Sequence, residues 1–149
     1  MAKRKKSSEF IEFSEDMIAA AGRSRGPLSK LDEAGREYVL ERYRKFLALA
    51  KRYPKQPLAP TGDIDEMWHL HMLMPRAYVN DCNSYFGEIL DHRAGFDPSD
   101  APKLREVFEK TAELWEEEFG EPYLKDQGSR SPLLVCFSAA EQAAARCHI

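Results

Sequence analysis

Residues 60–75 read Pro-Thr-Gly-Asp-Ile-Asp-Glu-Met-Trp-His-Leu-His-Met-Leu-Met-Pro, and the chain is organised around this stretch and its continuation to His92. Three of the four histidines, one of the three cysteines and one of the two tryptophans lie between residues 60 and 92. The rest of the chain reads as ordinary amphipathic helix. We therefore expect any chemistry of this protein to lie in this stretch.

The stretch predicts two short helices that meet at Pro75. Asp63, with Glu66 three residues later, fits a capping pair at the start of the first helix, which gives these acidic residues a structural role. Pro75 disfavours helical angles at the preceding residue, so the first helix should end near residues 72–73, and Pro75 can serve as the first residue of the second. The buried face of the second helix is predicted to hold Tyr78, Cys82, Tyr85 or Phe86, and Ile89.

Two further helices are expected before the stretch. The first spans 9–21 and ends at Gly22, the second spans 31–53, and a proline-rich connector at 54–61 follows. The apolar faces are Phe10, Phe13, Met17 and Ala20 on the first helix, and Val39, Leu40, Tyr43, Phe46, Leu47, Ala50 and Tyr53 on the second. The residues of the second helix expected to face water are Arg42, Arg44, Lys45 and Lys51.

After the stretch, a loop at 91–100 leads into another amphipathic helix. Asp100 is predicted to cap it, with Pro102 in its first turn. Its apolar stripe is Leu104, Val107, Phe108, Thr111, Leu114, Trp115 and Phe119. A connection at 120–132, an extended apolar segment at 133–137 and a final short helix at 138–146 complete the expected order.

These patterns predict an all-α fold, a single-domain compact bundle of about five to six helices with Pro- and Gly-rich connectors. A length of 149 residues suits one domain. We expect residues 1–8 to form a basic mobile tail and residues 9–149 one helical domain, with the Asp-x-Asp-x-x-Trp-His-x-His motif in its central segment, 63–92. The hydrophobic share of 43% and the charged share of 32% are typical of globular proteins.

Composition also limits the compartment and the partners. No apolar run approaches the roughly 18 residues needed to span a membrane, and no secretory segment is present, so a cytoplasmic protein without a membrane partner is expected. Three widely spaced cysteines fit a reducing compartment. The net charge of −3 argues against nucleic-acid binding, and without a Gly-rich phosphate loop no nucleotide cofactor is expected. The expected partner is therefore either a small molecule or a protein or peptide.

The most specific chemical hypothesis is a histidine-rich metal site. Imidazole suits zinc, copper, iron or nickel, and a histidine set completed by one carboxylate leaves positions open for water or substrate. We predict His69, His71 and His92 as ligands, with Asp65 as a fourth ligand or a hydrogen-bond acceptor for one. The residues expected to shape the pocket are Trp68, Tyr78, Asp81 and Cys82, of which Cys82 is expected to be a buried apolar residue that could add a thiolate.

Helix geometry restricts how two of these histidines can act. At about 3.6 residues per turn, His69 and His71 lie about 200° apart, whereas Asp65 and His69 share one face. Either the helix unwinds over residues 70–75, or only one histidine is a ligand and the other bonds backbone or a carboxylate across the core.

The position of His92 depends on how the helix after Pro75 ends. A regular helix to residue 89 would carry His92 about 22 Å away. We predict that the helix breaks near Gly87 or that the following loop folds back. The imidazoles of His69 and His92 should then lie close enough to share an ion or a bridging water.

The string of rare residues also resembles the signature of the glycine-rich-domain-containing-protein-like family, known from plants and bacteria. The resemblance implies a helical domain but no particular reaction. Plant members carry long glycine-rich regions, whereas this chain has 8 glycines and no such tract, so functions of that region are not carried over. The matching positions are Asp63, Asp65, Trp68, His69, His71, Leu73, Pro75, Tyr78, Asp81, Cys82, Phe86, Gly87 and His92.

Two classes of function follow from these patterns. The first is a metal-binding protein that acts as a metal-dependent enzyme, either an oxidoreductase or a modifying enzyme. The second is a non-catalytic interaction or scaffold module, in which the histidines are core residues with satisfied ring nitrogens. A further set, Cys136, Cys147 and His148, matches no zinc spacing, and its role stays open.

Overall fold

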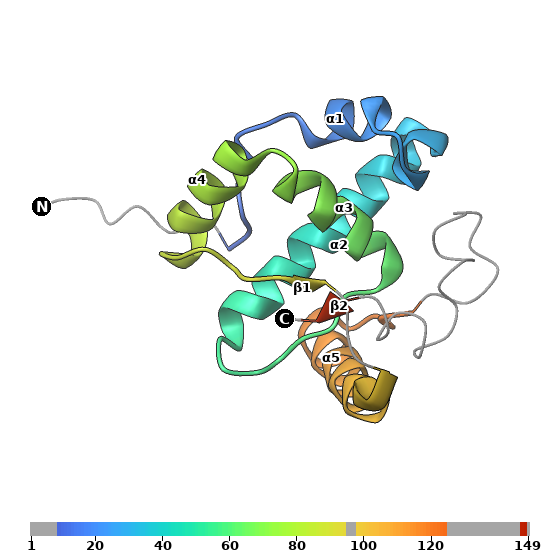
Figure 1. Cartoon of the computed structure of the whole chain (residues 1–149), viewed down its shortest axis with the longest axis vertical. Coiled ribbons are helices and arrows are strands. Elements are labelled where there is room, and N and C mark those ends of the chain that lie inside the picture. Colours follow the sequence, from blue (N-terminus) through green and yellow to red (C-terminus); the bar gives the residue numbers. More distant parts are fainter. Residues whose placement is uncertain (1–8, 95–97, 125–146, 149) are drawn as a thin grey trace, which may run out of the picture.

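A computed structural model describes residues 9–94, 98–124 and 147–148 of the chain. Within these ranges it is helical, which confirms the predicted all-α class (Figure 1). The helices are α1 Met17–Arg23, η1 Pro27–Lys30, α2 Glu33–Arg52, α3 Gly62–Met72, α4 Pro75–Phe86, η2 Pro98–Asp100 and α5 Ala101–Phe119. The two-residue strands β1 Arg93–Ala94 and β2 Cys147–His148 pair in antiparallel fashion. The segments predicted at 133–137 and 138–146 lie outside the described residues.

Helix α2 is the central element of this arrangement. It contacts α1, α3 and α5, and it crosses the middle of the view in Figure 1. Asp32 caps its start by accepting a hydrogen bond from the amide of Gly35. The apolar face of α2 is buried as predicted, except that Tyr53 follows the helix end and is half-buried. The large side chains that fill the core beside it include Tyr43, Phe46, Leu47, Ile64, Met67, Trp68, Phe108 and Trp115. No helix in the described part of the chain is long and apolar enough to cross a membrane.

The first helix is shorter than the sequence predicted. It begins at Met17, where Asp16 caps it by accepting a bond from the amide of Ala19, and it continues through Gly22 to Arg23. The preceding residues bond to α4 instead: the Ser14 amide donates to Asp81, and the Tyr85 hydroxyl donates to the carbonyl of Glu9. The prediction of a helix over 9–21 was therefore wrong because tertiary partners satisfy this backbone.

Arg42 is the largest departure from the predicted surface. It was expected to face water, but only 3% of it is exposed, and its Nε donates to the Asp63 carboxylate over 2.7 Å. The same guanidinium donates to Thr61 Oγ1 and to the carbonyl of Tyr123. Asp63 is thus a buried ion partner and not a helix cap, and Thr61 is the residue that precedes α3.

The turn after α4 carries the chain back toward α3. Helix α4 ends at Phe86, and Gly87 follows with φ +81°, in the left-handed region that favours glycine. The predicted break near Gly87 is confirmed. Ile89 was expected on the buried face of this helix, but it lies beyond the helix end and is 54% exposed.

Substituting Gly87 should test the strain at this turn. We expect Gly87→Ala to lower the free energy of unfolding by about 1 to 2 kcal/mol, since an added Cβ meets no atom within 4 Å and only the positive φ opposes it. Gly26→Ala is the matched control because Gly26 has φ −94°. Urea unfolding of both variants gives the comparison, and equal stability of the two would contradict the expectation.

Candidate metal centre

The two histidines of α3 lie on different faces of the helix and contact different residues. The helix stays regular to Met72, and the Leu73 amide still bonds the His69 carbonyl at 3.0 Å. The unwinding that would bring His69 and His71 together does not occur. Instead His71 bonds a carboxylate across the core, as the alternative prediction expected for the histidine that is not a ligand.

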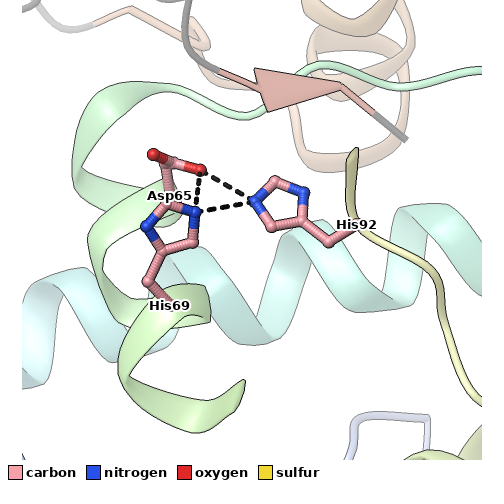
Figure 2. A group of neighbouring side chains, drawn as sticks. All are labelled: Asp65, His69 and His92. Carbon is pink, nitrogen blue, oxygen red and sulfur yellow. Dashed lines mark hydrogen bonds and ion pairs between the residues drawn. The ribbon is translucent and has the colours of Figure 1, made fainter. Parts of the chain in front are cut away.

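Three side chains converge on the other face of α3. Figure 2 shows Asp65 and His69, one turn apart on α3, meeting His92, which approaches from the segment after α4. Nε2 of His92 lies 3.0 Å from Nε2 of His69 and 3.0 Å from Oδ1 of Asp65, and the His69–Asp65 distance is 3.3 Å. This confirms the predicted closeness of His69 and His92, and the group could hold a metal ion.

The spacing of these atoms matches that of ligands around one ion. At bond lengths of about 2.0 to 2.2 Å, two ligand atoms lie about 3.0 Å apart at an octahedral angle and about 3.4 Å apart at a tetrahedral angle. The three observed separations fall between these values. No side chain has to move far for the three atoms to bind one cation.

Burial differs among the three residues. The side chains of Asp65 and His92 are almost entirely buried, whereas that of His69 is 38% exposed. The site therefore reaches solvent on the His69 side. Nδ1 of His92 is buried and has no hydrogen-bond partner among the described residues.

Aromatic packing orients His92. The Trp68 ring stacks on it with 3.8 Å between centroids and 18° between planes. The indole Nε1 donates to the Tyr78 hydroxyl at 2.9 Å, and that hydroxyl donates to the Leu90 carbonyl. Trp68, predicted to shape the pocket, thus lies against His92, whereas Tyr78, predicted to do the same, contacts Trp68 and the Leu90 carbonyl.

The remaining predicted site residues are placed elsewhere. Asp81 lies with His71 and not with Asp65. Cys82 is a buried free thiol whose pKa is raised by burial, as expected of a core residue. Cys136 lies outside the described residues, and Cys147 and His148 are described only as the backbone of β2, where His148 is opposite Arg93.

His71 forms a separate buried cluster. Its Nε2 lies 2.8 Å from Asp81 Oδ2 and its Nδ1 lies 2.8 Å from the Tyr43 hydroxyl. Because a carboxylate only accepts, Nε2 carries the proton, and Nδ1 accepts from Tyr43. Burial lowers the pKa of His71 and raises that of Tyr43, which favours the neutral form of both side chains. The cluster links α2, α3 and α4 and leaves His71 no free nitrogen for a metal.

Comparison with known proteins identifies the family of this chain. The sequence profile described as glycine-rich domain-containing protein-like matches residues 1–81, more than half of the chain. The chain belongs to this family. Glycine-rich domain-containing protein 1 of Arabidopsis thaliana is 39% identical over 92 residues, covering 58% of this chain and 11% of that protein. Glycine-rich domain-containing protein 2 of the same plant is 40% identical over 92 residues, covering 58% and 12%. No solved structure gives a significant match.

These comparisons limit what the family tells us about the site. The chain spans only about a tenth of the length of the two plant proteins, so their activities as whole proteins do not transfer to it. The matched segment of the glycine-rich domain-containing protein-like profile includes Asp65 and His69, while His92 lies after its end. The candidate centre thus combines residues inside and outside the profile match.

Sequence reasoning missed several partners of the predicted residues. Tyr43 was recognised as a core residue but not as the hydrogen-bond partner of His71, and the Leu90 carbonyl was not anticipated as an anchor for Tyr78. A tyrosine hydroxyl carries no spacing signal for its partner. A signal did exist for Arg42, because it lies next to Tyr43 and one turn before Phe46 in a helix with a broad apolar face.

The neutral state of buried His71 should make stability depend on pH. Below its ordinary pKa of about 6.5, His71 takes up a proton in the unfolded chain but not yet in the fold. Because the unfolded state then binds more protons, stability falls as the pH drops through this window, by at most about 1.4 kcal/mol per pH unit.

Urea unfolding of the wild-type chain and of His71→Gln between about pH 7.5 and about pH 5.5 tests this. The wild-type chain should lose more stability over this range than the variant, which lacks the titrating group. Equal losses in the two proteins would show that burial of His71 does not carry the pH dependence.

Proposed function

We propose that this protein binds a transition-metal ion through Asp65, His69 and His92. The observation that supports this most is the mutual spacing of Oδ1 and the two Nε2 atoms, all within 3.3 Å of one another. Two imidazoles and one carboxylate are a common donor set for zinc, copper, iron or nickel in proteins.

The geometry also favours an open metal centre. Three protein ligands leave one or more positions for water or a substrate, and the exposed flank of His69 gives access to them. One carboxylate leaves a divalent ion with net positive charge, which would favour an anionic or electron-rich ligand. When bound, the ion would supply Lewis acidity or redox chemistry. The finer proposal is a metal-dependent enzyme, an oxidoreductase or a modifying enzyme, that acts on a small molecule.

Metal analysis of the protein purified without a histidine tag tests the binding proposal. We expect about one equivalent of metal per chain. A metal concentration 100 times the dissociation constant should add about 2.7 kcal/mol of stability, which raises Tm by about 5 to 10 °C. A chelator should reverse the shift. Substoichiometric metal that does not reload after dialysis would contradict the proposal.

A second candidate is a non-catalytic interaction module in which the same residues serve packing. It is supported by the direct hydrogen bonds among the three side chains and by the stack of Trp68 on His92. In this case His92→Ala should lower the Tm of the metal-free protein, and a chelator should change nothing. In a metal site the same substitution also leaves a cavity, because the His92 side chain is buried. The result that distinguishes the two functions is therefore the metal-induced rise in Tm, which the wild-type chain should show and His92→Ala should abolish.

A further inference from the structure

The backbone just before His92 is held by a hydrogen bond from a side chain of α4. The Tyr78 hydroxyl donates to the Leu90 carbonyl at 2.5 Å, two residues before His92. The same oxygen accepts the indole N–H of Trp68 at 2.9 Å. One hydroxyl therefore joins the backbone before His92 to the ring that stacks on His92.

The polar contacts of the buried His92 ring all lie at one of its two nitrogens. Its two bonds to Asp65 and His69 both involve Nε2, and Nδ1 has no partner among the described residues. Polar contacts at one nitrogen do not by themselves define the plane of the ring, so packing must define it. Of its two recorded ring contacts, the one with Trp68 is closer and more nearly parallel, at 3.8 Å and 18° against 5.0 Å and 47° for His69, so Trp68 covers the flat face of the ring.

We propose that Trp68 and Tyr78 are positioning residues that hold the His92 imidazole in the orientation needed for metal binding. The proposal rests on the metal site proposed above for its effect on affinity, but the orientation of His92 can be measured without metal. Neither residue contributes a ligand atom to the cluster of Asp65, His69 and His92. Their influence on the ion passes through His92, as that of hydrogen-bond partners of metal ligands commonly does.

Tyr78→Phe could also act by a general loss of stability. A matched control must therefore delete a comparable buried hydroxyl away from His92. Tyr85 provides it, since it also lies on α4 and its hydroxyl also donates to a backbone carbonyl, that of Glu9 at 2.7 Å. Tyr78→Phe and Tyr85→Phe each delete one hydroxyl and one such bond. They differ in that only Tyr78 is linked to Trp68 and to the segment before His92.

The affinity of both variants for Zn²⁺, measured by competition with a chromophoric chelator, is the first readout. We expect Tyr78→Phe to bind Zn²⁺ about 10- to 100-fold more weakly than the wild-type chain, and Tyr85→Phe to bind within about twofold of it. The visible spectrum of the Co²⁺-loaded protein should also change for Tyr78→Phe alone. Equal affinities of the wild-type chain and Tyr78→Phe would overturn the proposal.

The second readout is the NMR spectrum of the metal-free proteins. Stacking on Trp68 should shift the His92 ring protons upfield, and Tyr78→Phe, but not Tyr85→Phe, should reduce this shift. If the wild-type chain binds no Zn²⁺ yet the shift responds in this way, the metal site fails while the positioning role stands. If the shift is unchanged in Tyr78→Phe, or falls equally in both variants, the positioning role is refuted.

Discussion

Asp63→Ala is expected to lower the free energy of unfolding by about 3 to 5 kcal/mol, because it leaves the Arg42 guanidinium buried without its counter-charge. The lost contact is the 2.7 Å ion pair, in which both side chains are at most 3% exposed. Arg42 also packs within 6 Å of the Trp115 and Tyr123 rings, so it cannot reach water without disturbing the core between α2 and α5. Urea unfolding at neutral pH measures the loss.

A surface ion pair provides the control for this effect. Lys110 and Glu113 lie 3.5 Å apart on α5, with side chains 44% and 57% exposed. Glu113→Ala should change stability by no more than about 0.5 kcal/mol. A loss of less than about 1 kcal/mol for Asp63→Ala would mean that Arg42 finds water or another acceptor when its partner is removed.

His69→Ala is expected to weaken binding of Zn²⁺ at least about 100-fold, since it removes one of three proposed ligands. Mutating a residue that only hydrogen-bonds to a metal ligand already lowers metal affinity about 10- to 100-fold, and loss of a ligand itself should cost at least as much. His69 is the best residue for this test because its side chain is 38% exposed. Its removal leaves no buried cavity like that left by His92 or Asp65. We expect the metal-free variant to keep its Tm within about 2 °C of the wild-type value.

Asp91→Ala is the matched control for ligand loss. Asp91 is adjacent to His92 and carries an exposed carboxylate, but it is not a member of the cluster. Its removal should leave the affinity for Zn²⁺ within about threefold, an effect of surface charge alone. Calorimetric titration of both variants distinguishes the cases. An equal loss in both, or no loss in His69→Ala, would show that the ion is held elsewhere.

Local sequence determined where most of the helices lie. Pro75 separates α3 from α4, and the apolar periodicity of α2 and α5 predicted their long spans, because proline geometry and helical spacing depend on neighbouring residues alone. The angular separation of His69 and His71 follows from the same helical spacing. From it the sequence already implied that only one of them could join Asp65 in a regular helix.

Tertiary structure decided which partner each polar side chain received. Ser14 meets Asp81 across 67 positions, Arg42 meets Asp63 across 21, and His69 meets His92 across 23. No local pattern encodes such pairs, since they depend on how α2, α3 and α4 pack. The N-terminal segment stays non-helical and Arg42 is buried for the same reason: distant partners satisfy their polar groups. The sequence by itself thus determined the helices and the candidate donors, and only packing determined which donors meet.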